Sequence, residues 1–336
     1  MPDLGFCDHM LREIELFIYS RQIRHIAGMT IDSPLIQVGE SCCVYPQNQP
    51  GGPLRAEVIG TKGNKMVLMP FNECTCDPGS KIVSVNHCTM VPVGMQFIGR
   101  IVDGRGNPLD QKGEIRTRSF YNLENYHKEE MQCTPQSEPL SLGMGELDNF
   151  LHCKKGDRIS LMSNSVENED RLTGTIARQG ESDVNVIVLT GGNTNDVKRF
   201  VQYDLKDKGL QKSVLIVADE DQPAFVRVRA TFLAATISEY FRDHGMHAML
   251  FIRSLTDFIK AQTDIGLSTG ERLLPNGYPP SVFTKLLDLL DRAGSSKSGS
   301  VTGLYSVLTE HLDIEEPVFA VLKDYVQGQI VLSGAS

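Results

Sequence analysis

The chain has 336 residues, of which 40% are hydrophobic and 22% are charged, and its formal net charge is −9. This balance is typical of a globular protein of two or three domains and excludes an intrinsically disordered chain. The acidic charge argues against a nucleic-acid-binding surface, so we expect no nucleic-acid partner.

The first part of the chain is predicted to be an arm followed by an all-β domain. Residues 1–19 carry apolar side chains at helical spacing, so we expect a leading helix or arm. In residues 20–93, short β-branched runs alternate with glycine, asparagine and proline turns, which is typical of a small β-barrel. The sequence has no apolar run of about 18 residues and no basic and apolar leader. We therefore expect a cytoplasmic protein.

Eight cysteines are spread along the chain. Because no export signal is evident, we expect their thiols to be reduced. Cys74, Cys76, His87 and Cys88 could in principle enclose zinc. However, the Cys-x-Cys spacing is a poor match to the usual zinc knuckle, and the segment between the pairs reads as a strand. We therefore expect no metal site.

The remainder of the chain is predicted to be a linker followed by an α/β domain. Residues 94–139 read as a connecting strand and a polar linker. In residues 140–336, apolar strands alternate with helices, which predicts a mainly parallel sheet covered on both faces. The predicted strands are 158–162, 184–190, 213–218, 248–252, 300–308 and 329–332, and the clearest predicted helices are 225–241 and 313–327.

Residues 157–178 have the outline of a phosphate-binding loop. A β-rich run leads into a polar turn, and a helix is predicted to begin near Leu172. Such a turn holds nucleotide phosphates when it reads Gly-x-x-x-x-Gly-Lys-Ser/Thr, because glycine allows close backbone approach and lysine neutralises charge. Here the turn from Ser163 to Asp170 has no glycine and no lysine but three carboxylates. We therefore do not expect ordinary ATP hydrolysis at this loop.

Several short segments form a collinear pattern. They include Gly99-Arg-Ile-Val-Asp-Gly-Arg-Gly-Asn-Pro-Leu-Asp110, Ser213-Val-Leu-Ile-Val-Ala218 with Asp221-Gln-Pro223, Ser238-Glu-Tyr-Phe-Arg-Asp243 and Gly277-Tyr-Pro-Pro-Ser-Val-Phe283. Their order and spacing resemble the ATPase of type III protein export, the flagellar and injectisome family related to the rotary ATP synthase subunits. The resemblance extends from about residue 20 to the C-terminus.

The resemblance implies a RecA-like, P-loop-type α/β core with a mainly parallel sheet, preceded by an N-terminal β-barrel. It also implies export-apparatus partners, such as a stator, chaperones and related ATPase subunits, and a place peripheral to the inner membrane. The family continues beyond the position of Ser336 into a C-terminal helical domain, so we expect a truncated, degenerate member. For the same reason, a homohexamer is expected no more than a monomer or a hetero-assembly.

The resemblance also implies positions for the family's nucleotide site. The loop that begins at Ser163 carries Asn168 at the family's glycine, Glu169 at its phosphate-binding lysine and Asp170 at its magnesium-holding Ser/Thr. Carboxylates here also have a structural interpretation, since acids at a helix N-terminus cap free N–H groups and favour the helix dipole. This capping role is the interpretation we favour for Glu167, Glu169 and Asp170. A repurposed cation site and surface acids without a role remain open.

Two further positions of the family's catalytic machinery are altered. The water-activating glutamate falls on Gly192, which has no side chain to orient water. The magnesium-linked aspartate falls on Arg253. The family reads Asp-Ser-Leu-Thr-Arg here and this chain reads Arg253-Ser-Leu-Thr-Asp257, an exchange that suggests a retained salt bridge, although coincidence explains it nearly as well.

These observations predict a catalytically inactive homologue of the export ATPase that serves as a structural or regulatory component of a secretion or flagellar export apparatus. No catalytic residue and no cofactor are expected on this interpretation. The alternative is a divergent active ATPase that energises type III protein export and uses ATP and magnesium. A gene product without a present role is the third possibility.

Overall fold

The computed structural model describes most of the chain beyond residue 37 and short pieces before it. The leading helix predicted for residues 1–19 lies outside the described residues, and so do Cys74, Cys76 and Cys88 of the possible zinc cluster. The described residues are 21–22, 25–26, 29–31, 38–46, 53–63, 65–71, 80–87, 90–124, 138–308 and 317–332.

The chain divides into two compact units, one made of Met1–Thr89 with Asp264–Arg272 and the other of Met90–Thr263 with Leu273–Ser336. The first unit contains a seven-stranded antiparallel sheet in the order β1-β7-β4-β5-β6-β3-β2. It confirms the all-β prediction for this part of the chain. The strands are β1 Arg21–Gln22, β2 His25–Ile26, β3 Met29–Ile31, β4 Glu40–Tyr45, β5 Leu54–Lys62, β6 Lys65–Pro70 and β7 Lys81–His87.

Buried side chains from neighbouring strands form a small hydrophobic core in this first unit. Cys42 and Val44 on β4 are fully buried and pack with Val58, Leu68 and Ile82 from neighbouring strands. Because side chains of a strand alternate between the two faces, every second residue contributes to the same core.

The second unit contains an eight-stranded sheet in the order β17-β11-β16-β14-β12-β13-β9, with β15 paired to β16. All pairings along the ordered path are parallel. The mainly parallel, RecA-like core is therefore confirmed. Its strands are β9 Ile101–Asp103, β11 Arg158–Ser163, β12 Val184–Thr190, β13 Ser213–Ala218, β14 His247–Arg253, β15 Gly294–Ser295, β16 Ser300–Leu308 and β17 Gly328–Leu332, and a separate two-stranded sheet joins β8 Met90–Val93 to β10 Ser119–Asn122.

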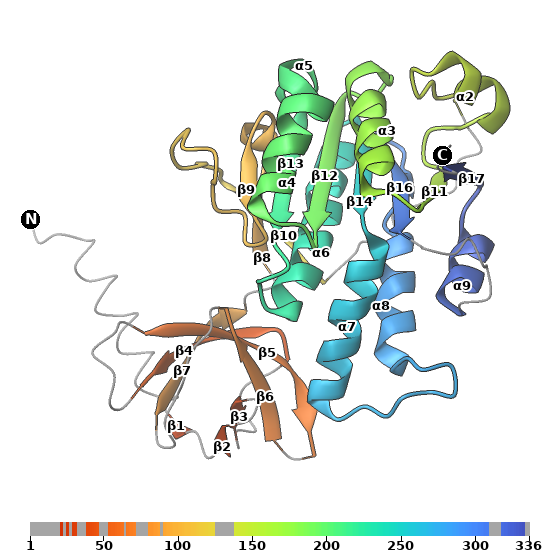
Figure 1. Ribbon diagram of the computed structural model, residues 1–336. Helices are drawn as coiled ribbons and strands as arrows, with labels where there is room; N and C mark the ends of the chain where they lie inside the picture. Colours follow the sequence, from red (N-terminus) through yellow and green to blue (C-terminus); the bar gives the residue numbers. More distant parts are fainter. Residues whose placement is uncertain are drawn as a thin grey trace, which may run out of the picture. The chain divides into compact units, whose positions relative to one another are not determined.

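Helices cover both faces of the large sheet, as the continuous apolar strands require. All seven residues of β12 are buried. Figure 1 shows α3 and α5 on one side of the sheet and α6 on the other. The helices are η1 Met95–Phe97, α2 Gly145–Leu151, α3 Val166–Gln179, α4 Thr194–Arg199, the π-helix η3 Phe200–Leu205, α5 Lys206–Gln211, α6 Ala224–Asp243, α7 Leu255–Thr269, α8 Pro280–Leu290 and α9 Pro317–Tyr325.

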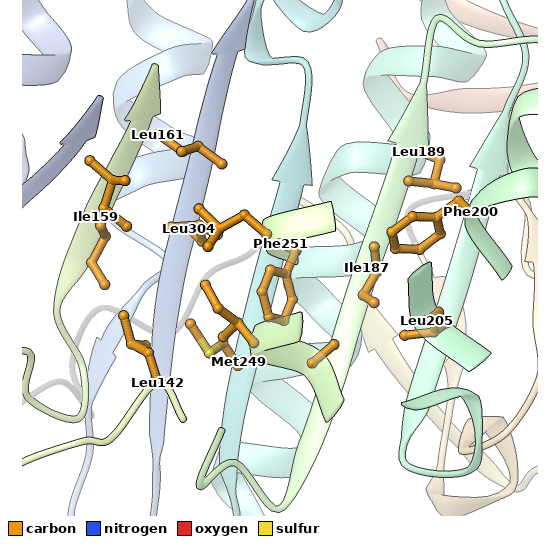
Figure 2. Close-up of a cluster of buried hydrophobic side chains, with 14 of the residues drawn as sticks. Leu142, Ile159, Leu161, Ile187, Leu189, Phe200, Leu205, Met249, Phe251 and Leu304 are labelled. Atoms are coloured by element: carbon orange, nitrogen blue, oxygen red, sulfur yellow. The ribbon is translucent and has the colours of Figure 1, made fainter. Parts of the chain in front are cut away.

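The face of the sheet under α3 carries an extended hydrophobic cluster. Leu304 of β16, Phe251 of β14 and Ile187 of β12 lie in a row across the strands, and Figure 2 shows Met249 further along β14. Leu172 and Ile176 of α3 belong to the same cluster. Since alternate residues share a face, Arg253 and Ser306 continue this face at the carboxyl ends of β14 and β16.

Among the described helices, none has the length and hydrophobicity needed to cross a lipid bilayer. The residue boundaries predicted for the arm (1–19), the barrel (20–93), the linker (94–139) and the core (140–336) remain predictions.

Candidate functional site

The turn between β11 and α3 is too short to form an open phosphate loop. β11 ends at Ser163 and α3 begins at Val166, six residues before the predicted start near Leu172. Ser165 caps the helix, because its hydroxyl accepts a hydrogen bond from the backbone N–H of Asn168 at 3.4 Å. The hydroxyl of Ser163 donates to the carbonyl oxygen of Ser165 at 2.8 Å and tightens the turn. The predicted helix start was wrong because this serine cap initiates the helix earlier.

Two backbone N–H groups in the first turn of α3 are already engaged. The N–H of Asn168 bonds the hydroxyl of Ser165, and the N–H of Glu169 donates to the carbonyl oxygen of Ser165 at 3.2 Å. A phosphate-binding loop instead leaves its N–H groups free to surround the phosphate oxygens. In this structure, therefore, Asn168 and Glu169 are part of the helix and do not form a cradle.

Asp170 forms a buried ionic cluster with two arginines. The Nε atom of Arg253 lies 2.8 Å from Oδ1 of Asp170, and both side chains are at least nine-tenths buried. Arg199 from α4 donates from Nη2 to Oδ2 of Asp170 at 3.1 Å, and from Nη1 to the exposed Glu167 at 2.9 Å. Burial raises the pKa of Asp170 to about 6. The guanidinium groups of Arg253 and Arg199 have the opposite effect and limit this rise. Asp170 is thus ionised at neutral pH and paired with cations of its own chain.

Glu169 is buried on the neighbouring side of the helix. It is 1% exposed and accepts a hydrogen bond from the hydroxyl of Ser306 on β16. Burial raises the pKa of Glu169 to about 7, while Ser306 and Arg253 oppose the shift. Ser254, which follows Arg253, has a positive φ of 60°, and its N–H donates to Ser306 at 3.0 Å.

These contacts correct the capping interpretation of the three acids. Ser165 caps α3, whereas Glu169 and Asp170 turn inward to partners on the sheet and on α4. Only Glu167 is a solvated acid of the first turn.

Gly192 lies next to the same cluster. It follows β12 and directly precedes Asn193, the N-cap of α4, whose side chain forms a capping box with Asp196. A Cβ atom at Gly192 would lie 3.5 Å from Nη1 of Arg253 and 3.5 Å from Asp196. That Nη1 atom is buried and has no hydrogen-bond partner within the part of the chain that the structure describes.

The structure therefore brings the predicted site residues together at the carboxyl ends of the parallel strands. Ser163 ends β11, Gly192 follows β12, Arg253 ends β14, and Asp170 on α3 contacts Arg253. The correspondence of these positions to the family's lysine, glutamate and aspartate stays a prediction. The suggested salt bridge between Arg253 and Asp257 was wrong: Arg253 pairs with Asp170, and the carboxylate of Asp257 packs against Gly191.

Sequence reasoning missed two residues of the cluster. Ser306 is a buried polar residue of β16, but the same strand also contains Ser300 and Thr302, so the sequence did not single it out. Arg199 carried no signal, because it resembles any charged residue near the end of a short helix.

Comparison with known proteins identifies the family. Residues 143–335 match the sequence family described as ATP synthase alpha/beta family, nucleotide-binding domain. The flagellum-specific ATP synthase of Bacillus subtilis (strain 168) is 36% identical over 94% of this chain and 72% of its own length. The chain belongs to this family. Its branch is that of the flagellar and type III secretion ATPases, as the resemblance predicted.

Solved structures of the family agree with the fold. The assembled ATPase EscN of the enteropathogenic E. coli type III secretion system matches with a TM-score of 0.82 and 30% identity, over 93% of this chain and 75% of EscN. EscN in complex with its central stalk EscO matches with a TM-score of 0.80, 30% identity and the same coverage.

The family match corrects the expectation that the chain has no cofactor. That expectation was wrong, because residues 143–335 form the nucleotide-binding domain of a family whose members are ATP synthases and ATPases. The family implies ATP with magnesium. At the beginning of α3, however, the residues do not fit a triphosphate, since the N–H groups of Asn168 and Glu169 are engaged and Asp170 is paired internally. No catalytic step through a nucleotide follows from these residues.

Proposed function

We propose that this chain is a non-hydrolysing member of the flagellar and type III secretion ATPase family. The observation that carries the proposal is the buried ion pair between Arg253 and Asp170, with Gly192 beside it. Phosphoryl transfer depends on positive charge held around the phosphates and on a residue that orients water. In this cluster the guanidinium groups of Arg253 and Arg199 are directed to Asp170, and Gly192 supplies no carboxylate.

The size of the expected loss supports this proposal. Removing one preorganised electrostatic donor costs about 10²–10³ in kcat, and losing a general acid or base costs about 10²–10⁴. Both are altered here if Glu169 and Gly192 correspond to the family's lysine and glutamate. Together these losses lower turnover by about 10⁴–10⁷-fold.

The proposed role is that of a structural or regulatory component of a secretion or flagellar export apparatus. Structures of EscN exist for its assembled form and for its complex with the central stalk EscO. The fold of this chain matches that of EscN over 93% of this chain. We infer that this chain likewise contacts export components, including a stator, chaperones or related ATPase subunits. Through them it works in the cytoplasm at the inner membrane.

The test is phosphate release by the purified chain with Mg-ATP, with the B. subtilis relative as the active control. We expect no turnover above that of the buffer. Turnover that Asp170→Asn abolishes would overturn the proposal in favour of a divergent active ATPase. A nucleotide that binds without being hydrolysed is compatible with the proposal.

The apparatus role needs a separate measurement. We expect the tagged chain to co-purify with export components from its own cells, and a tagged unrelated protein to recover none. Recovery of the chain without any export component would contradict the proposed role. It would favour a gene product that has no present function.

A further inference from the structure

A polar cavity of about 380 Å³ lies at the amino ends of three adjacent strands of the large sheet. Asp183 precedes β12, His247 begins β14 and Ser300 begins β16, and all three line the cavity. Since the strands are parallel, this is the opposite end of the sheet from the cluster around Asp170. The cavity is thus separate from the site described above.

His247 is the buried polar group of this cavity. It is 5% exposed, and its Nδ1 lies 2.7 Å from the hydroxyl of Ser300. Its Nε2 atom is buried and has no hydrogen-bond partner among the described residues. Burial, with a contribution from Lys155, lowers the pKa of His247 to about 4, so the ring is neutral at neutral pH. A neutral imidazole with Nδ1 engaged offers one further hydrogen bond at Nε2.

The charged groups of the lining are balanced. Lys155 and Lys297 provide two ammonium groups, while Glu138 and Asp183 provide two carboxylates. The Nζ atom of Lys155 lies 2.7 Å from Oε2 of Glu138, and the backbone N–H of His247 donates to Asp183 at 2.7 Å. Lys155 lowers the pKa of His247, whereas Asp183 and Glu138 raise it. Positive and negative side chains therefore lie close together around this ring.

A ligand with a single sign of charge meets unfavourable charges in such a cavity. An anion would face Glu138 and Asp183, and a cation would face Lys155 and Lys297. A molecule with both an ammonium and a carboxylate group satisfies both sets. The volume lies at the lower end of the range for small-molecule sites, about 300–1,000 Å³.

We propose that this cavity binds a small zwitterion of the α-amino acid class. The ligand carboxylate pairs with Lys155 and Lys297, and its ammonium group pairs with Glu138 and Asp183. The ring of His247 lines the cavity and reports on its occupancy. This inference is independent of the proposed function, because none of its residues belongs to the cluster around Asp170.

The test is an NMR titration of the full chain with labelled histidine, in which the standard protein amino acids are added singly at millimolar concentration. We expect at least one of them to shift the imidazole signals of His247 in a saturable way. The N-acetyl and amide derivatives of that amino acid each lose one charge and should bind about tenfold to a hundredfold more weakly. The proposal would be overturned if no amino acid gave a saturable shift, or if either derivative bound as tightly as the amino acid itself.

Substitutions in the lining and a second probe test which groups hold the ligand. Lys155→Met should weaken the binding at least as much as loss of the ligand carboxylate does, and His247→Gln should weaken it less. Lys154→Met is the matched control, because Lys154 is adjacent in sequence but does not line the cavity. Equal affinity of the Lys155→Met and Lys154→Met variants would contradict the assignment. Saturable shifts with inorganic phosphate, and none with amino acids, would identify an anion site instead.

Discussion

The Nε atom of Arg253, at the end of β14, lies 2.8 Å from Oδ1 of Asp170 on α3, and side-chain exposure is only 6% and 1%. Neither charge has enough contact with water to be stable alone, so each depends on the other. The pair ties α3 to the centre of the large sheet at the place where the family's nucleotide site is expected. It connects the stability of the fold to the proposed loss of hydrolysis.

Removal of Arg253 should strongly destabilise the protein. Arg253→Ala leaves Asp170 buried without its main partner, and breaking a buried pair in this way costs about 3–5 kcal/mol. Arg253→Asp should cost more, because two carboxylates then face each other. The measurement is the free energy of unfolding from denaturant titration. Arg116→Ala is the control, since Arg116 is 91% exposed, and an equal loss in both alanine variants would rule out the buried pair.

Replacement of Glu169 should stabilise the protein at alkaline pH. The pKa of Glu169 is raised from 4.5 to about 7 in the folded state, so its stability contribution is complete below about 4.5 and is lost as the pH rises through about 7. Glu169→Gln removes this loss and should raise the free energy of unfolding by about 2–3 kcal/mol near pH 8, with little change near pH 4.5.

The exposed Glu167 provides the control for that experiment. Its side chain is 73% exposed, so Glu167→Gln should change the free energy of unfolding by less than about 0.5 kcal/mol at either pH. A Glu169→Gln variant whose pH dependence is the same as that of the parent would show that Glu169 does not titrate as described.

The two glycines after β12 should respond differently to substitution. Gly191 has a φ of 72°, and the carboxylate of Asp257 occupies the position of a Cβ atom there. Gly191→Ala should therefore lower the free energy of unfolding by about 2 kcal/mol or more. A Cβ atom added at Gly192 would have its nearest neighbours at 3.5 Å. Gly192→Ala should therefore change the free energy of unfolding by less than about 1 kcal/mol. Equal losses would contradict this packing.

Restoration of a carboxylate at Gly192 should not restore turnover. The Gly192→Glu side chain would enter beside Nη1 of Arg253 and pair with it, while Glu169 and Asp170 remain unchanged. We expect a folded variant with phosphate release from Mg-ATP no faster than that of the parent chain. Turnover in the single variant would show that Gly192 alone accounts for inactivity.

His247 should weaken the fold in acid. Its pKa is lowered from 6.5 to about 4 in the folded state, so the unfolded chain binds the proton first and stability is lost as the pH falls from about 6.5 to about 4. The full effect is about 3 kcal/mol. His247→Gln should flatten this part of the stability profile, measured by thermal unfolding over that range. An unchanged profile would show that the imidazole is not neutral and buried.

The sequence by itself determined the architecture and the altered loop. Apolar strands such as 184–190 and 213–218 can be buried only between two layers of helices, so their alternation with helices predicted the parallel sheet. The absence of glycine and lysine between Ser163 and Asp170 is a property of the residues themselves, visible without coordinates.

Only the tertiary structure decided where the acids and the arginine point. Asp170 and Arg253 are 83 residues apart, and Arg253 was expected to pair with the nearby Asp257. The serine cap at Ser165 sets the start of α3 and therefore the rotation of the helix, which turns Glu169 and Asp170 toward the sheet. Strand register then brings Arg253 and Ser306 to the same edge. Such pairings depend on the relative placement of whole elements, and local sequence carries no information on that placement.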